Sequence, residues 1–201
     1  MARETSDLKS VFINCPFDNA YSSLFDAIVF TVAACGLEPR SSLEGGAIGE
    51  PRLERITRAL FASHFSIHDL TRCTGQGPEN FARFNMPLEL GLAMAHRLLS
   101  SGETKHEWMV MVPQGHTYAR FISDLNGFDP ARHDGTVRGV VTQVLSWLSE
   151  RPMVSAWPEP RILLDALPRF EGAVHALRTQ WEPADPPWRE VVEAAKRHWP
   201  A

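Results

Sequence analysis

HFSIHDLTRCTGQGPENFARFNMPLELGLAMA, residues 64–95, joins the pattern of a short buried strand to the pattern of a helix. Residues 65–70 include aromatic and β-branched side chains, and residues 71–78 are rich in turn formers. A run of this kind, stopped by turn residues, predicts a strand. Asp69 is therefore expected at the carboxyl end of a buried strand.

A helix is predicted from Pro87 onward, because proline has a helical φ and lacks only an N–H that the first turn does not need. Glu89 then falls in the first turn, on a different face from the apolar residues. Gly91 leaves the space beside Glu89 free of a side chain, which allows a ligand or a backbone to approach. The apolar face is predicted to contain Leu88, Leu92, Ala95 and Leu98 or Leu99.

Glu89 has a structural and a functional interpretation. A capping box requires Ser, Thr, Asp or Asn three positions before the Glu, but position 86 is Met and Asn85 is four positions before. A favourable charge on the helix dipole remains a structural explanation. The dipole would also keep the carboxylate ionised, as a nucleophile or a stabiliser of a cationic sugar requires. We favour the functional interpretation.

Strand and helix patterns alternate along the first three-quarters of the chain. Such alternation is typical of a parallel sheet covered on both faces. We therefore predict a flavodoxin-like (Rossmann-like) α/β domain of four or five strands over residues 1–157, and a helical C-terminal extension over 158–201, packed on the domain or at an oligomer interface. The strands are expected at 10–15, 37–44, 65–70 and 107–113, with a short fifth at 153–156, and helices at 20–35, from 51, from 87 and around 137–148.

Ligands of open parallel sheets bind beyond the carboxyl ends of the strands. This rule is expected to bring together the loop Pro16–Asp18, Arg40 or Glu44, Asp69 and the start of the Glu89 helix. His116 and His133 follow the fourth strand and could reach the same rim, although their spacing forms no metal motif. We expect no metal site.

Composition excludes several classes of function. A net charge of −4 over 201 residues argues against a broad nucleic-acid surface. Three cysteines, Cys15, Cys35 and Cys73, suit neither a disulfide framework nor a zinc site and agree with a reducing cytoplasm. The polar start MARETSDLKS and the lack of an apolar run of ~20 residues lead us to expect neither a signal peptide nor a membrane segment.

SIHDLTR followed by RFNMPLELGLAMA resembles the paired motifs of the nucleoside 2-deoxyribosyltransferase-like and Toll/interleukin-1 receptor (TIR)-like superfamily. VFINCPFDNAYSSLFDAIVFTVAACGLEPR, residues 11–40, is similar to the first strand, loop and helix of its bacterial TIR-like branch. The resemblance covers roughly the first two-thirds of the chain. It implies cleavage or transfer of an N-glycosidic bond, with NAD, a nucleotide or a nucleoside as substrate and no other cofactor. It also implies a homo-oligomer in a bacterial defence or toxin-like system, with a defence-system protein as a possible partner.

By position, Glu89 matches the catalytic Glu of the superfamily, Asp69 the acid at the strand end, and Asn85 the polar residue before the catalytic helix. Glu89 is expected to stabilise or trap positive charge on the sugar, and Asp69 to hold a ribose hydroxyl or activate water. Asn85 is expected to bind substrate through its amide. As structural alternatives, Asp69 would cap a turn and Asn85 would be the helix N-cap.

The loop Pro16, Phe17, Asp18 matches the superfamily only as a loop. Phe17 or Tyr21 is a candidate to stack on a base, and Arg40 to bind a phosphate, although an Arg after a strand is more often a paired surface group. Two other classes stay open: a non-catalytic nucleotide sensor or adaptor of the same fold, and a phosphoacceptor receiver. The receiver lacks support, because Asp18 is a single acid and no Lys ends the fourth strand.

Overall fold

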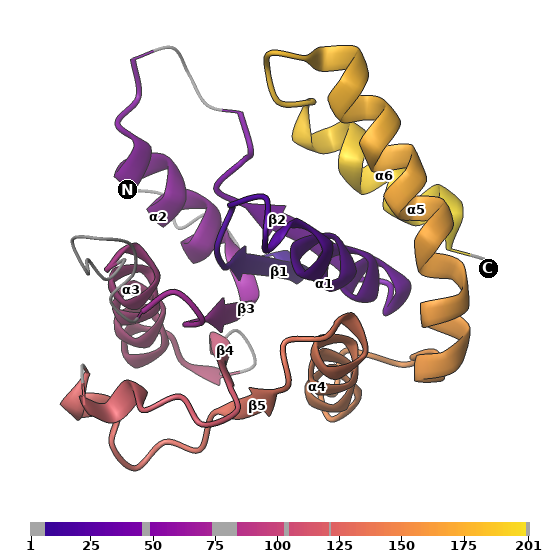
Figure 1. The fold of residues 1–201 in the computed structure, drawn as a ribbon. Coiled ribbons are helices and arrows are strands. Elements are labelled where there is room, and N and C mark those ends of the chain that lie inside the picture. Colours follow the sequence, from indigo (N-terminus) through magenta and orange to yellow (C-terminus); the bar gives the residue numbers. More distant parts are fainter. Residues whose placement is uncertain (1–6, 46–48, 74–83, 103–104, 121, 200–201) are drawn as a thin grey trace, which may run out of the picture.

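The computed structural model describes residues 7–45, 49–73, 84–102, 105–120 and 122–199. In this part of the chain, five parallel strands form one sheet in the order β2-β1-β3-β4-β5 (Figure 1). The expected flavodoxin-like α/β fold is thereby confirmed. The strands are β1 (Asp7–Asn14), β2 (Glu38–Ser41), β3 (Ser63–Asp69), β4 (Glu107–Pro113) and β5 (Ala131–His133).

The helices of the described chain cover both faces of the sheet. α2 and α3 pack together on one face, and α1 and α4 on the other, with α5 and α6 as a further layer over α1 (Figure 1). Their bounds are α1 (Ser22–Ala34), α2 (Arg52–Ala62), α3 (Asn85–Leu99), α4 (Val137–Ser149), α5 (Pro160–Trp181) and α6 (Trp188–His198). Two single-turn 3₁₀ helices, η2 (Tyr118–Arg120) and η3 (Ser123–Leu125), precede β5.

The fifth strand is β5, so the expected strand at 153–156 is wrong. Residues 131–133 read Ala-Arg-His and carry no apolar strand pattern. They become a strand because Met111, near the end of β4, pairs with Ala131. Tertiary pairing, which a local sequence pattern does not record, forms this element.

α1 is buried from Phe25 to Ala34, which leaves only its first three residues partly or fully exposed. The reason is that it lies between the sheet and the C-terminal helices, where Phe30 stacks on Phe170 with ring centroids 5.1 Å apart. Gly36, at φ +73°, follows the end of α1, as expected for a glycine in the left-handed region. The C-terminal helices thus complete the main hydrophobic core.

The buried face of α3 differs from the expected one. Met86, Glu89, Leu90 and Ala93 face the protein, whereas Leu88 is 56% exposed. Leu98 and Leu99, also expected on the buried face, are exposed as well. α3 is apolar on more than one side, so helical spacing alone did not identify the packed side. Ala93 packs with Phe12 and Leu60 in one buried cluster. Its small side chain lets α3 approach the sheet more closely than the leucines on the other side of the helix would.

Two further helical details are not what helical spacing alone predicts. Spacing from Pro51 places Leu53 in the core, but Leu53 is 50% exposed, and α2 buries Ile56, Ala59 and Leu60 instead. A proline such as Pro168 tends to divide a helix, but α5 runs unbroken through it from Pro160 to Trp181. Packing of apolar residues such as Phe170 on α1 holds the helix together across the proline. None of the helices in the described ranges has the length and apolar character of a membrane span.

Candidate active site

Asp69 ends β3 and lies fully buried among hydrogen-bond donors. Its carboxylate accepts a hydrogen bond from the Tyr21 hydroxyl at 2.5 Å and from the Thr71 backbone N–H at 2.8 Å. The Thr71 hydroxyl donates to it as well, and His133 Nε2 lies 3.0 Å from Oδ2. Asp69 therefore ties three elements of the rim together: the start of α1, the turn after β3 and the end of β5.

The hydrogen bonds of His133 indicate which of its ring nitrogens carries the proton. The Gly135 backbone N–H lies 3.2 Å from Nδ1, so Nδ1 is an acceptor. Nε2 then carries hydrogen and donates to Asp69, which a neutral imidazole can do. His133 thus reaches the rim, as the sequence allowed, but as a partner of Asp69. The turn-capping alternative for Asp69 is realised through Thr71. A role in activating water stays a prediction and requires one of the present donors to give way.

Glu89 is 7% exposed and lies on the inner face of α3. Burial raises the pKa of its carboxyl from an ordinary 4.5 to about 7, against the opposing influence of Arg52. Glu89 is the fifth residue of α3, so the expectation that it lies in the first turn is wrong. The dipole effect decays within that turn. Burial, not the dipole, controls the ionisation of Glu89 and leaves the carboxyl poised between its two protonation states near neutral pH.

Glu89 and Asp69 act on the same neighbour, Cys15, which directly follows β1. Burial, followed by the negative charges of Asp69 and Glu89, raises the pKa of the Cys15 thiol well above its usual range. Charges separated by low-dielectric protein still act on each other strongly at short range. Both carboxyl groups therefore belong to one rim, at the carboxyl ends of β1 and β3, as the strand-end rule predicts.

Asn14, at the end of β1, anchors the start of α3 to the sheet. Its side-chain N–H groups donate to Met86 O at 3.0 Å and to His68 Nδ1 at 2.8 Å, and the residue is 2% exposed. Met86 precedes Glu89 by less than one helical turn. Asn14 thus positions the segment that carries Glu89. Sequence analysis missed it, because its two partners are 54 and 72 residues away in the chain.

Asn14 is also the first member of a buried chain of hydrogen bonds. His68 Nε2 contacts Ser66 Oγ, and Ser66 Oγ contacts His106 Nε2, each at 2.8 Å. His106 Nδ1 then lies 2.9 Å from Ser63 O. Because the first donor is an amide and the last acceptor a carbonyl, both imidazoles donate in the same direction and are neutral. Burial lowers the pKa of His68 to about 3 and that of His106 to about 4.

The loop after β1 places its predicted residues differently. Pro16 is buried, whereas Phe17 is 38% exposed and contacts Phe25 edge to face at 5.2 Å. Asp18 forms a bidentate pair with Arg72, with distances of 3.1 and 3.2 Å. Tyr21 is only 1% exposed and contacts Asp69 through its hydroxyl, so it does not present a ring face to a ligand. Phe17 is the aromatic side chain that remains available for stacking.

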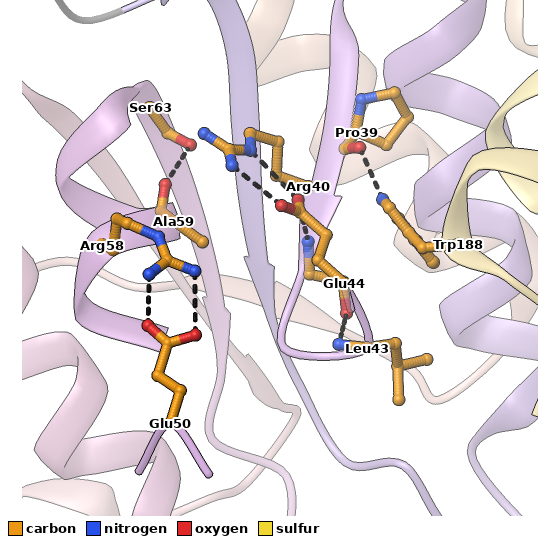
Figure 2. Close-up of polar contacts among 10 residues, drawn as sticks. Pro39, Arg40, Leu43, Glu44, Glu50, Arg58, Ala59, Ser63 and Trp188 are labelled. Carbon is orange, nitrogen blue, oxygen red and sulfur yellow. Dashed lines mark hydrogen bonds and ion pairs between the residues drawn. The ribbon is translucent and has the colours of Figure 1, made fainter. Parts of the chain in front are cut away.

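Arg40 and Asn85 were also predicted to bind substrate, and the structure shows Arg40 paired with Glu44 and Asn85 exposed. Figure 2 shows the guanidinium of Arg40 against the carboxylate of Glu44, with donor–acceptor distances of 2.8 and 3.0 Å. This is the paired-surface arrangement considered for Arg40, and phosphate binding by it stays a prediction. Asn85 is exposed, and the N-cap of α3 is Phe84, so the interpretation of Asn85 as the N-cap is wrong. Helix α3 simply begins one residue earlier than that role requires.

His116 is the other histidine that follows β4. Its two ring nitrogens are enclosed and have no hydrogen-bond partner among the described residues. Burial lowers the pKa of its imidazole, while the charge of Asp69 opposes this effect. The ring therefore lies within electrostatic reach of the rim. No group of three His, Cys, Asp or Glu side chains suited to a metal ion is found in the described ranges.

Comparison of the chain with protein-family models, with curated proteins and with solved structures found no match. The chemistry of the site therefore has to be argued from its own residues.

Proposed function

We propose that this protein cleaves or transfers an N-glycosidic bond of a nucleotide, a nucleoside or NAD, with Glu89 at the reacting sugar. The observation that carries the proposal is a buried carboxyl group with a pKa raised to about 7, at the strand-end rim of a parallel sheet. Perturbed carboxyl groups in such positions are typical of catalytic sites. The sequence resemblance to the deoxyribosyltransferase-like and TIR-like superfamily supports the same reaction class.

The proposed reaction follows from the bond. As the bond between ribosyl C1′ and the base nitrogen breaks, its electron pair leaves with the base, and the sugar ring becomes positively charged. Ionised Glu89 stabilises this charge or adds to C1′, and water or a second acceptor then takes the sugar and loses a proton. Because low-dielectric surroundings strengthen the attraction between carboxylate and cation, burial of Glu89 favours the transition state.

Asp69 has a supporting role in this proposal. It is a fixed negative charge beside the site, because Tyr21, Thr71 and His133 hold it in place. If the Thr71 hydroxyl rotates away, Asp69 can accept a hydrogen bond from a sugar hydroxyl instead. Asn14 keeps α3 in register with the sheet and so keeps Glu89 in place. The three cysteines are buried and free, which agrees with the cytoplasmic location that we propose.

A defence or toxin-like role, a homo-oligomer and a defence-system partner remain part of the proposal on the strength of the resemblance alone. In such a role the protein would cleave its nucleotide only after an activating signal. The C-terminal helices are mostly committed to the core, so an oligomer would use other surfaces, such as the exposed leucines of α3.

The test is release of free base from NAD, NADP and a panel of nucleosides and nucleotides by purified protein, followed by chromatography. Wild type is expected to release base, and Glu89→Gln to lose at least a hundredfold in rate. The matched control is Glu54→Gln, which changes an exposed carboxyl on α2 and is expected to retain the rate. Equal rates in wild type and Glu89→Gln would contradict the proposal.

A nucleotide sensor of the same fold is the second candidate. The observation in its favour is that Asp69 is fully engaged by protein donors, which suits a rigid binding site as well as a catalytic one. A sensor would bind a nucleotide without releasing base, and Glu89→Gln would then change affinity only.

A further inference from the structure

A cavity of about 230 Å³ lies between the loop after β1 and the link that joins α5 to α6. Its walls are partly aromatic. The rings of Phe17 and Phe25 meet edge to face, and the ring centroids of Phe25 and Trp188 lie 5.9 Å apart. Asn19 and Arg178 also line it, together with two acidic residues, Asp18 and Asp185. Whole-ligand cavities measure about 300–1,000 Å³, so this one suits a single planar ring with polar edges.

The cavity adjoins the rim that holds the two carboxyl groups. Asp18 lines the cavity and is held by Arg72, which follows Asp69 by three residues. Cys15, at the base of the same loop, responds to the charges of Asp69, Glu89 and Asp18. One loop therefore forms a wall of the cavity and a wall of the candidate active site.

Arg72 stands between the two places and is suited to an anion. Asp18 engages its Nε and Nη2 atoms, and a guanidinium has further N–H donors on Nη1. The side chain is 27% exposed, so a ligand can reach it. Arginine in a fixed orientation is well matched to phosphate oxygens.

A larger hollow of about 560 Å³, on the side of β2, shares Leu43, Asp185, Pro186 and Trp188 with this cavity. Figure 2 shows Trp188 there, with its indole N–H donating to Pro39 O at 3.1 Å. Four carboxyl groups line the larger hollow, those of Glu38, Glu44, Asp185 and Glu193, beside Arg189 and an Arg40 that Glu44 already engages. Only two carboxyl groups, those of Asp18 and Asp185, line the smaller cavity, and Arg72 binds the first of them. The smaller cavity is therefore the better site for a nucleotide.

We propose that the 230 Å³ cavity binds the planar ring of a nucleotide, and that Arg72 binds its phosphate. The inference rests on the proposed function and extends it: the substrate is a nucleotide and not a nucleoside, and the C-terminal helices form part of its binding site through Trp188. The ring in this cavity lies away from the bond that Glu89 cleaves, so the substrate carries a second ring or base beyond its phosphate.

The test uses full-length protein carrying Glu89→Gln, which prevents turnover, with AMP as the probe in titration calorimetry. Asn19→Trp fills the cavity mouth and is expected to weaken AMP binding at least tenfold. Phe17→Ala removes a stacking partner and is expected to weaken it about fivefold. Thr142→Trp on α4 and Phe128→Ala near Trp108 are matched controls and are expected to leave binding unchanged.

The phosphate is tested by comparing AMP with adenosine. AMP is expected to bind more tightly than adenosine, and Arg72→Met is expected to abolish the difference. AMP binding that Asn19→Trp and Phe17→Ala leave unchanged would overturn the proposal, as would the absence of binding at millimolar AMP. If Asn19→Trp loses AMP binding but wild type releases no base, the cavity binds the nucleotide and the protein is not a glycosidase. If wild type releases base and Asn19→Trp releases it equally well, the protein is a glycosidase but the cavity is not its nucleotide site.

Discussion

Glu89 combines a carboxyl group with a buried position on α3, and burial opposes its ionisation. An ionised carboxylate at this buried position therefore lowers the stability of the protein, whereas the same group at the surface would not. A residue that lowers stability without a structural benefit is typical of functional sites. Asp69 is different, because its four donors make it a structural centre of the rim as well.

The cost of Glu89 predicts a pH-dependent stability difference. The pKa of Glu89 is about 7 in the folded protein and 4.5 as its ordinary value, so the folded state binds its proton more tightly than the unfolded state does. The resulting contribution to the free energy of unfolding is fully present below pH 4.5 and is lost as the pH rises through 7. Glu89→Gln should therefore raise the free energy of unfolding by on the order of 3 kcal/mol at pH 8 and by little at pH 4. Urea unfolding at both pH values measures this. Glu54→Gln, the surface control, should show no such trend; a gain of equal size at both pH values would contradict the burial argument.

At the scale of the elements, Asn14 links β1, β3 and the first turn of α3. Asn14→Ala should cost about 1–3 kcal/mol of stability, because buried polar groups lose their partners. It should also let water reach Glu89 and move the Glu89 pKa from about 7 toward 4.5. NMR titration of the Glu89 carboxyl checks the second effect. Thr31→Ala, a buried change on α1, controls for lost stability alone; an unmoved Glu89 pKa in Asn14→Ala would show that the anchor does not position this group.

Local patterns predicted the elements that depend on local physics. Residues 65–70 and the helix after Pro87 are recognisable because apolar spacing and turn residues coincide there, and Asp69 follows from them. β5 was not predictable, because three residues without an apolar pattern pair only when β4 is beside them. The burial of Glu89 was missed for a related reason: α3 is apolar on several sides, and only packing against residues such as Phe12 selects one. The Asn14 anchor depends entirely on contacts between distant parts of the chain.

At the scale of the whole molecule, the C-terminal helices are integral to the domain. Arg178 of α5 donates two hydrogen bonds, of 2.7 and 2.9 Å, to Asp26 of α1, whose carboxyl is 5% exposed. Burial raises the pKa of Asp26 and Arg178 opposes the rise. Truncation before α5 would therefore expose apolar residues of α1 and remove the arginine that pairs with Asp26.

The pair predicts a coupled stability effect. Arg178→Met should cost about 2 kcal/mol, since it leaves a buried charge uncompensated, with a discount for the partial exposure of Arg178. Asp26→Asn in the same chain should recover part of that loss. Urea unfolding of the single and double variants measures the coupling. Arg161→Met, at an exposed position of α5, is the control. An equal loss of stability in Arg161→Met and Arg178→Met would contradict a specific stabilising role of the Arg178–Asp26 pair.

The most direct test of the account is the pH dependence of base release by wild type and Glu89→Gln, with NAD and nucleotides as substrates. In the proposed reaction ionised Glu89 is the reacting form. Because the pKa of Glu89 is about 7, the wild-type rate should rise about tenfold from pH 6 to pH 8 and level off above pH 8. Glu89→Gln should show little release at any pH. Base release that persists in Glu89→Gln with the same pH profile would contradict a reaction centred on Glu89.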